Sequence, residues 1–272
     1  TRRLIESDTI RNRAAAKRSP VVRASSRRST TPGHTLQADG WGTATESVVD
    51  GSSYAMGLIN EATTFGYQAS TRLHTSAKWI VFSKRVILAE RALGHDVRII
   101  KVDMGSDLCS EEYRDAMLDL NVLVQVAPRH GHEFVGLMEC TNDSRTRAAE
   151  AMCERARKGP GFLIPARLYA GVLANHKQAT PMPWRTAAQR RMTRSELHTG
   201  VRTSLTHRPL YTVGTEVLVL EDKQTRGPYG STERPRSTVG MLIGAEENCY
   251  LVLRGGRVYR PRHVQPTNEL AM

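Results

Sequence analysis

Cysteines and long apolar runs are both scarce in this sequence. Its 272 residues include four cysteines, and no two of them have the CxxC spacing of a zinc ribbon. This scarcity argues against a disulfide framework and is typical of a reducing compartment. No run approaches the roughly 20 apolar residues of a membrane span, and no signal-peptide pattern is present. We therefore expect a soluble, intracellular protein that has no membrane partner.

Other signals of known enzyme classes are also missing. The chain has no serine or cysteine nucleophile motif and no phosphate-cradling glycine loop, which argues against acyl-transfer enzymes and P-loop nucleotidases. The first residue is Thr1 rather than Met, so we expect the chain to be cut from a longer product.

Acidic residues are outnumbered, because 39 Lys and Arg stand against 27 Asp and Glu. The formal net charge of +12 favours a polyanionic partner such as nucleic acid, although a basic protein without such a partner is the alternative. Residues 1–33 carry nine basic and two acidic side chains and few apolar ones. We expect them to form a flexible basic linker, with Lys17-Arg18 and Arg27-Arg28 either binding phosphates, serving as a nuclear import signal or simply being solvated.

Residues 34–176 have the periodicity of alternating strands and helices, which predicts a single α/β core. Gly94 is suited to a left-handed helix end, and Ser110 to a helix N-cap. In chain order we expect strands at 35–38, 53–59 and 65–69, a helix at 75–93, a strand at 97–102, a helix at 110–120, a strand at 121–127, and helices at 137–157 and 162–175. This succession is typical of a ribonuclease-H-like fold, a mixed sheet flanked by helices.

The remainder of the chain changes character twice. Residues 177–209 are polar, basic and contain proline, and we expect a linker there. Residues 210–266 contain short apolar strands separated by Gly, Asn and charged turns, with Gly255-Gly256 suited to a hairpin turn. They predict a small β-rich module.

Three carboxylates are placed where separate elements begin or end. Asp39 follows a short strand, Asp103 closes the strand at 97–102, and Glu139 lies at the start of a helix, on the side opposite Leu137 and Cys140. Two divalent cations need carboxylates that converge from different elements, so this pattern favours a two-metal phosphoryl-transfer site. The alternatives are a turn residue before Gly40, a strand-ending cap, and a helix-start anion that is stabilised by the macrodipole.

The residues around these carboxylates resemble the integrase core of copia-type retrotransposons. The similar segments are Leu36-Gln37-Ala38-Asp39-Gly40-Trp41-Gly42, Val102-Asp103-Met104-Gly105, the stretch from Ala127-Pro128 to Gly136-Leu137-Met138-Glu139, and the apolar stretch from Leu168 to Asn175. Downstream, Gly240-Met241-Leu242-Ile243-Gly244, Tyr250-Leu251-Val252 and 257–264 resemble elements that follow that core.

The resemblance implies a polynucleotidyl transferase that processes retrotransposon DNA ends and joins them to target DNA. Asp39, Asp103 and Glu139 would be its catalytic residues and its ligands for Mg²⁺, or Mn²⁺ in its place. The implied partners are double-stranded DNA, both element ends and target, and further copies of the chain in a homo-oligomer. The implied location is the nucleus, after a cytoplasmic particle stage.

Several positions depart from that family's pattern. Residues 1–33 contain neither His nor Cys, so the zinc module that precedes such cores is absent from this sequence. Met104, Phe134, Val135 and Cys140 replace polar or basic residues, and Asn60 stands where an Asp is common. A catalytically decayed, non-enzymatic nucleic-acid-binding remnant is therefore the alternative. A ribonuclease or transposase of the same fold is a third reading.

The remaining candidates are nucleic-acid contacts. His130 and His132, with Glu133 and Cys140 nearby, lack the further converging ligands of a zinc site, so we expect no zinc and assign the two imidazoles to DNA phosphate. Asn142 is a further candidate DNA contact. In the last hairpin Arg257, Arg260 and Arg262, together with Arg254, predict a basic stripe that contacts DNA, with an ordinary solvated β face as the alternative.

Overall fold

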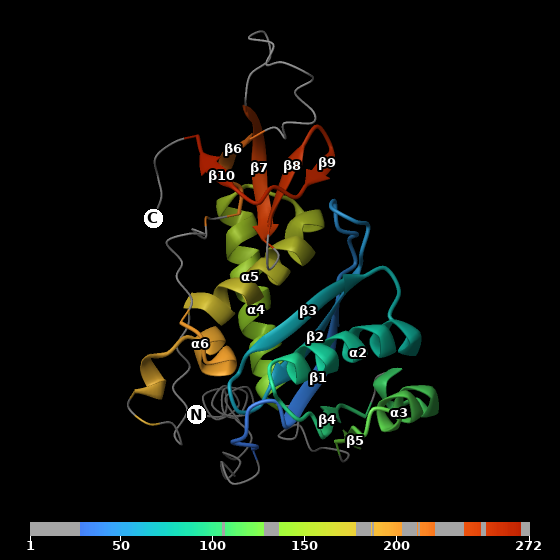
Figure 1. Cartoon of the computed structure of the whole chain (residues 1–272). Coiled ribbons are helices and arrows are strands. Elements are labelled where there is room, and N and C mark those ends of the chain that lie inside the picture. The colour runs from blue at the N-terminus through green and yellow to red at the C-terminus, as the bar shows by residue number, and fades with distance from the viewer. Residues whose placement is uncertain are drawn as a thin grey trace, which may run out of the picture.

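The computed structural model describes residues 28–104, 107–127, 136–177, 186, 188–202, 211, 213–220, 237–245 and 249–267. Within these ranges the chain forms two five-stranded sheets, and helices cover both faces of the first (Figure 1). No helix in the described ranges is long and apolar enough to cross a membrane. The basic segment 1–27 and the residues His130 and His132 lie outside the described residues.

The first sheet is mixed, as the order of elements predicts. Its strands follow the order β3-β2-β1-β4-β5. The first three pair antiparallel, whereas β1, β4 and β5 pair parallel. The five strands are β1 (Thr35–Gly42), β2 (Tyr54–Asn60), β3 (Gly66–Thr71), β4 (Ile99–Val102) and β5 (Leu123–Val126). This mixed sheet with its helices is the ribonuclease-H-like fold that the sequence predicts.

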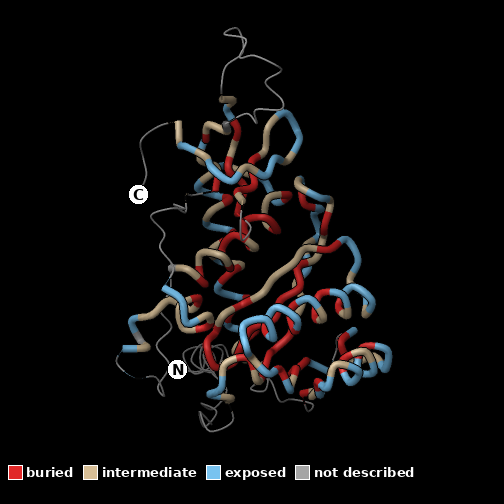
Figure 2. The backbone as a smooth tube through the Cα atoms, in the orientation of Figure 1, coloured by how far each residue is buried: buried red, intermediate tan, exposed pale blue. Residues whose placement is uncertain are grey.

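One face of this sheet is covered by α2 (Ser76–Ala92) and α3 (Glu111–Leu118). Alternate strand residues such as Leu36 and Val102 are fully buried against Trp79 of α2, because successive residues of a strand point to opposite faces. Figure 2 shows buried backbone along the strands and exposed backbone along the outer faces of these helices. The predicted helix ends are confirmed: Gly94 has φ +82°, and the Ser110 hydroxyl accepts a hydrogen bond from the Tyr113 amide at 3.2 Å.

The other face is covered by α4 (Gly136–Arg155) and α5 (Leu163–Lys177), which pack against each other. The far side of α5 carries the second sheet, whose order is β10-β6-β7-β8-β9. Its strands are β6 (Glu216–Leu220), β7 (Ser237–Ala245), β8 (Tyr250–Arg254), β9 (Arg257–Tyr259) and β10 (Val264–Pro266). The expected turn joins β8 and β9, and both Gly255 and Gly256 have positive φ, at 54° and 74°.

The second sheet shares a hydrophobic core with the first module through α5. Tyr169 of α5 is fully buried among Val217, Leu242 and Val252 of the sheet, and its hydroxyl donates to the carbonyl of Tyr211. Because each sheet needs an apolar partner for its inner face, one helix buries apolar surface on both sides. The second sheet is therefore packed directly on the α/β core.

Two features differ from what the sequence led us to expect. The buried face of α4 includes Met138, Asn142, Arg145 and Ala149, whereas Cys140 is exposed. The apolar pattern misleads because two polar side chains occupy the core-facing stripe. The stretch 177–209, expected to be a linker, contains the short helices η5 (Gln189–Arg191) and α6 (Arg194–Thr199), and α6 contacts α5. Short 3-10 turns, η2 (Asp107–Cys109) and η4 (Pro160–Phe162), complete the described helices.

A buried chain of polar contacts joins the first sheet to the start of α4. Glu61, directly after β2, has no exposed side-chain surface and forms an ion pair with Lys101 of β4, with 2.7 Å between Oε1 and Nζ. The Gln37 amide of β1 donates to the same oxygen at 2.7 Å, and its carbonyl accepts from the Met138 backbone amide at 3.0 Å. An otherwise unpaired N–H at the start of α4 is thereby satisfied from within the sheet.

Replacing Lys101 by Met tests this chain of contacts. Lys101→Met leaves the Glu61 carboxylate buried without its cation, and we expect the free energy of unfolding to fall by about 3–5 kcal/mol. The double variant Lys101→Met/Glu61→Gln removes both charges and should recover most of that loss. Urea unfolding followed by circular dichroism measures both variants; equal losses in the single and double variants would contradict the assignment.

Candidate functional site

Asp39 and Asp103 lie next to each other where the parallel pairing of β1 with β4 ends. β4 stops at Val102, whereas β1 continues past Asp39 to Gly42, so this strand is longer than the sequence predicts. Ala38 of β1 pairs with Val102 of β4, so the two aspartates follow paired residues. Ala38 and Val102 are buried on the α2 face, and their successors point to the opposite face because strand side chains alternate. That face is covered by α4: a Cβ on Gly57, the residue paired with Asp39, would meet Met138 of α4.

The carboxylate of Asp39 is held by two hydrogen bonds. Its Oδ1 accepts from the Gly40 amide at 2.8 Å, and its Oδ2 accepts from the side-chain amide of Asn142 at 2.6 Å. Burial raises the pKa of Asp39, the two hydrogen bonds and the charge of Arg167 oppose that rise, and the nearby Asp103 carboxylate adds to it. The net shift of the Asp39 pKa is upward, so ionised Asp39 is destabilised at this position.

Asn142 connects Asp39 to a buried arginine of α5. Its Oδ1 accepts from Nη2 of Arg167, whose side chain is only 1% exposed and stacks on the Trp41 ring with 4.8 Å between its Cζ and the ring centroid. Burial lowers the pKa of Arg167 to about 10, and the Asp39 charge opposes that fall. The sequence reasoning missed Arg167, although it is the one charged residue in the apolar stretch 162–175.

A second buried guanidinium lies behind Arg167. Arg145 of α4 is 2% exposed, and none of its three guanidinium nitrogens has a hydrogen-bond partner in the described part of the chain. Burial, together with the charges of Arg167 and Arg194, lowers the Arg145 pKa to about 9. Two buried arginines, Arg145 of α4 and Arg167 of α5, are thus near enough for the charge of one to affect the other.

Glu139 lies on α4 in its first turn and is exposed, as the sequence predicts. Met138, whose amide is held by Gln37, precedes it, and Asn142 follows three residues later on a neighbouring part of the helix surface. The three carboxylates do not form a compact group: among the described residues, the one set of three potential ligands whose atoms all lie within 4.8 Å of one another is elsewhere. The structure places Asp39 beside Asp103, and their convergence with Glu139 stays a prediction.

The expected nucleic-acid contacts have different surroundings. Asn142 is 7% exposed and engaged at both ends of its amide, because its helix turns it toward Asp39 rather than toward solvent. The DNA contact expected for Asn142 stays a prediction. The contact that the structure shows is its hydrogen bond to Asp39, which suits a residue that positions this carboxylate. Arg257, Arg260 and Arg262 are exposed at the β9 end of the second sheet, which suits the contact expected for them.

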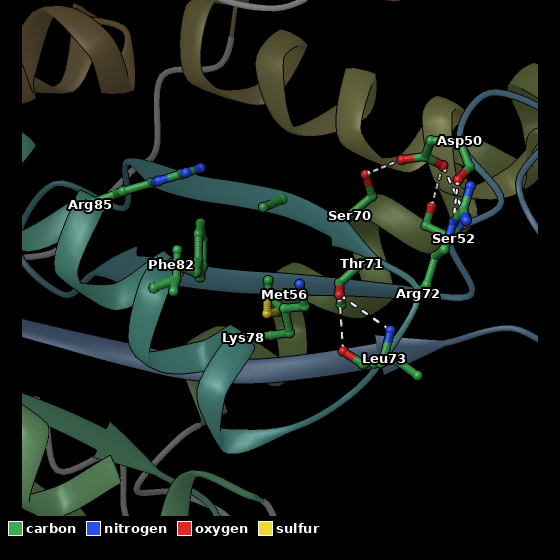
Figure 3. Close-up of a pocket in the computed structure, with 12 residues that line it drawn as sticks. Asp50, Ser52, Met56, Ser70, Thr71, Arg72, Leu73, Lys78, Phe82 and Arg85 are labelled. Atoms are coloured by element: carbon green, nitrogen blue, oxygen red, sulfur yellow. Dashed lines mark hydrogen bonds between the residues drawn. The ribbon is translucent and has the colours of Figure 1, made fainter. Parts of the chain in front are cut away.

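A hollow of about 490 Å³ lies on the opposite face of the first sheet, between β3 and α2 (Figure 3). Asp50 lies at one end, where its carboxylate accepts hydrogen bonds from the hydroxyls of Ser52 and Ser70 at 2.6 and 2.7 Å. Burial raises the pKa of Asp50, but these hydrogen bonds outweigh it and the net shift is downward. The hollow is separated from Asp39 and Asp103 by the sheet, so it is not part of the carboxylate site.

The comparisons with known proteins concern the fold. A chain in the cryo-EM structure of the simian T-cell lymphotropic virus intasome in complex with PP2A regulatory subunit B56 gamma has a TM-score of 0.50 and 16% identity, over 88% of this chain and 80% of that one. The HTLV-2 integrase catalytic core domain in complex with magnesium, in trimeric and dimeric forms, is 17% identical over 63% of this chain and 99% of its own, with a TM-score of 0.46. No model of a protein family and no curated protein matches the sequence. At 16% identity, the similarity to the intasome chain concerns the fold alone.

Removing the charge of Asp39 should stabilise the protein in a pH-dependent way. Because the pKa of Asp39 is raised in the folded state, its contribution to stability is present below the ordinary Asp pKa of about 3.9 and is lost as the pH rises through the raised value. Asp39→Asn should therefore gain stability relative to wild type between pH 4 and pH 7, as measured by urea unfolding. Asp119→Asn, at an exposed position after α3, is the control. An advantage of Asp39→Asn that does not grow with pH would contradict this account.

Proposed function

We propose that this chain is a polynucleotidyl transferase of the integrase type, which processes retrotransposon DNA ends and joins them to target DNA. The observation that carries the proposal is the position of Asp39 and Asp103, which directly follow the last paired residues of β1 and β4, Ala38 and Val102. Asp39 lies on the face that α4 covers, with Glu139 in the first turn of that helix. The integrase-like fold and the sequence resemblance support the same function. The finer assignment to a copia-type element rests on the resemblance.

The donor set suits Mg²⁺ or Mn²⁺. All three side chains offer carboxylate oxygen, which these hard cations prefer. The Asp103 carboxylate helps to raise the pKa of Asp39, and a cation held beside Asp39 would offset that effect. Two such ions, when bound, supply the polarisation of the scissile phosphate and the activation of a water or 3′-hydroxyl. Asp39, Asp103 and Glu139 would hold them.

The residues around Asp39 act by positioning it. Asn142 donates to one carboxylate oxygen, and the Gly40 amide donates to the other, so the carboxylate plane is held before substrate arrives. The Arg167 side chain is itself held in place, because it donates to Asn142 and stacks on the Trp41 ring. Preorganised ligands of this kind lower the reorganisation that a phosphoryl-transfer step requires.

Double-stranded DNA is the proposed substrate. The net charge of +12 supplies phosphate affinity through counterion release, and the exposed arginines of the second sheet extend a basic surface beyond the core. Integration also requires that two DNA ends be held together, so we propose a homo-oligomer on DNA. The proposed location is the nucleus, reached after a cytoplasmic particle stage.

The second candidate is a DNA-binding remnant without catalysis. It is favoured by the spread of the three carboxylates, which are not all within 4.8 Å of one another, and by the replacements at Met104 and Cys140 beside two of them. The fold and the basic charge are the same in both candidates, so only metal-dependent chemistry separates them.

Nicking of supercoiled plasmid in Mg²⁺ and in Mn²⁺ tests the enzyme directly, because it needs no knowledge of the element's own ends. Wild type should nick DNA only with metal, whereas Asp103→Asn and Glu139→Gln should fall to background, since each removes one carboxylate ligand. Asp119→Asn is the matched control and should keep wild-type activity. Nicking that survives in Asp103→Asn, or is absent from wild type, would reject the enzyme; retained salt-sensitive DNA binding would then favour the remnant.

The arginines of the second sheet have their own test. If Arg257, Arg260 and Arg262 each contact a phosphate, the triple Ala variant should reduce the slope of log K against log salt by about 2–3, at roughly 0.9 per contact. The measurement is fluorescence anisotropy with duplex DNA at several salt concentrations. Arg98→Ala, at an exposed position before β4, is the control. An unchanged slope in the triple variant would assign these arginines to an ordinary solvated strand face.

A further inference from the structure

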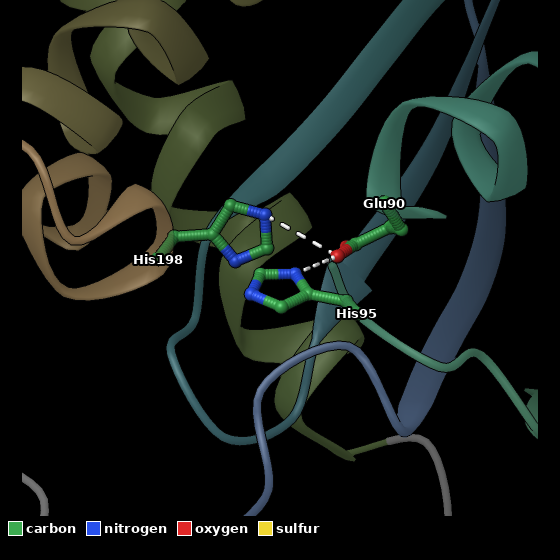
Figure 4. A group of neighbouring side chains, drawn as sticks. All are labelled: Glu90, His95 and His198. Atoms are coloured by element: carbon green, nitrogen blue, oxygen red, sulfur yellow. Dashed lines mark hydrogen bonds and ion pairs between the residues drawn. The ribbon is translucent and has the colours of Figure 1, made fainter. Parts of the chain in front are cut away.

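Three potential metal ligands meet far from the carboxylate site. Glu90 comes from the last turn of α2, His95 from the chain just after it, and His198 from α6, about a hundred residues later in the sequence. Their ligand atoms all lie within 4.8 Å of one another, and Figure 4 shows both imidazoles turned toward the Glu90 carboxylate. The Nδ1 of His95 is 2.6 Å from Oε2 of Glu90, and the Nε2 of His198 is 3.4 Å from the same oxygen.

The group is shielded from solvent. The side chains of Glu90 and His198 have no exposed surface, and that of His95 is 15% exposed. Phe65 stacks on the His198 ring with 4.4 Å between centroids and an angle of 1° between the planes. Gly33 covers the other side, where a Cβ would meet His95 and lie 3.3 Å from Oε2 of Glu90. A small ion fits this enclosure better than an organic ligand does.

The hydrogen bonds of the group leave one buried oxygen unsatisfied and bring an imidazole nitrogen close to the carboxylate. Oε1 of Glu90 is buried and has no hydrogen-bond partner in the described part of the chain. Nδ1 of His198 lies 3.1 Å from the Thr63 hydroxyl; if this nitrogen carries the ring proton, the Nε2 lone pair faces the Glu90 carboxylate and the Tyr67 hydroxyl, which is 3.2 Å from it. In that state Nε2 and the Glu90 Oε2 are two acceptors 3.4 Å apart, and a cation between them would bind both in place of the Tyr67 hydrogen bond.

We propose that Glu90, His95 and His198 form a structural site for Zn²⁺ or a similar transition-metal ion. Two imidazole nitrogens and a carboxylate oxygen are ligands that Zn²⁺ accepts, whereas Mg²⁺ prefers oxygen alone. The Thr63 hydroxyl would accept the second ring N–H of His198, which is the outer contact that orients metal-binding histidines. The second Glu90 oxygen or a water supplies the fourth ligand. The sequence led us to expect no zinc, and this proposal departs from that expectation.

Such a site would attach α6 to the core. α6 has six residues, too few for a helix to be stable by itself, and His198 is one of its two buried residues. A metal bridging His198 to Glu90 and His95 would hold the stretch after α5 against the end of α2. The proposal does not depend on the proposed function, because none of the three ligands contacts Asp39, Asp103 or Glu139 among the described contacts.

The test uses the full chain freed of metal with a chelator and then titrated with Zn²⁺ or Co²⁺. We expect one equivalent to bind and the Tm to rise by roughly 5–10 °C at a hundredfold excess over Kd. The Co²⁺ form should show the visible bands of a nitrogen- and oxygen-bound ion, without the near-ultraviolet thiolate band that a cysteine site would produce. His198→Gln should lose the equivalent and the rise in Tm, whereas His263→Gln, at an exposed position, should keep both.

Two further measurements keep the outcome clear. Asp103→Asn should still bind the equivalent, which separates this site from the carboxylate pair; loss of binding there would reject the proposal. If His198→Gln does not fold, X-ray absorption of Zn²⁺-loaded wild type decides, and it should show two imidazoles and no sulfur. Wild type that binds no Zn²⁺, or His198→Gln that binds it equally, would overturn the site and leave Glu90, His95 and His198 as a buried hydrogen-bonded group.

Discussion

The buried carboxylate of Glu61 determines how the helices meet the first sheet. It lies at the end of β2 with no exposed side-chain surface, so its charge has to be met inside the protein by Lys101 of β4 and the Gln37 amide of β1. The same Gln37 side chain then accepts the backbone amide of Met138 and so places the start of α4 over β1. One desolvated charge therefore joins three segments that are distant in the sequence.

The candidate site depends on that placement. With the start of α4 held against β1, Asn142, one helical turn after Met138, donates to Asp39. Arg167 of α5 in turn donates to Asn142. This arrangement has an electrostatic cost. Burial raises the pKa of Asp39 and lowers that of Arg167, so the charged form of each side chain is disfavoured. A site that is costly without cations and ready to accept them is what a metal-dependent phosphoryl transferase needs, and the raised pKa of Asp39 links its stability to its chemistry.

The helix α5 gives the two sheets a common core. Tyr169 is buried on the side that faces β7, while Asn175 faces the first sheet and its amide exchanges hydrogen bonds with the backbone of Gly66, at 3.0 and 2.8 Å. An almost wholly apolar helix is explained by this double burial, since a helix that faces solvent needs a polar side. The exposed arginines near β9 are thereby carried on the same packed body as the carboxylates, and α6 is placed near the end of α2, where His198 meets Glu90.

The sequence by itself determined the order and type of the elements. Period-two alternation and apolar spacing located the strands and helices of the first sheet, and Ser110 and Gly94 marked helix ends, because these signals act within a few residues. It also singled out Asp39 and Asp103, which the structure places directly after the paired residues Ala38 and Val102. Only the tertiary structure decided that Asn142 faces inward, that Arg167 supports it, and that Glu90, His95 and His198 form one group. Each of these depends on which distant polar groups are left to pair after the chain has packed, and no local pattern contains that information.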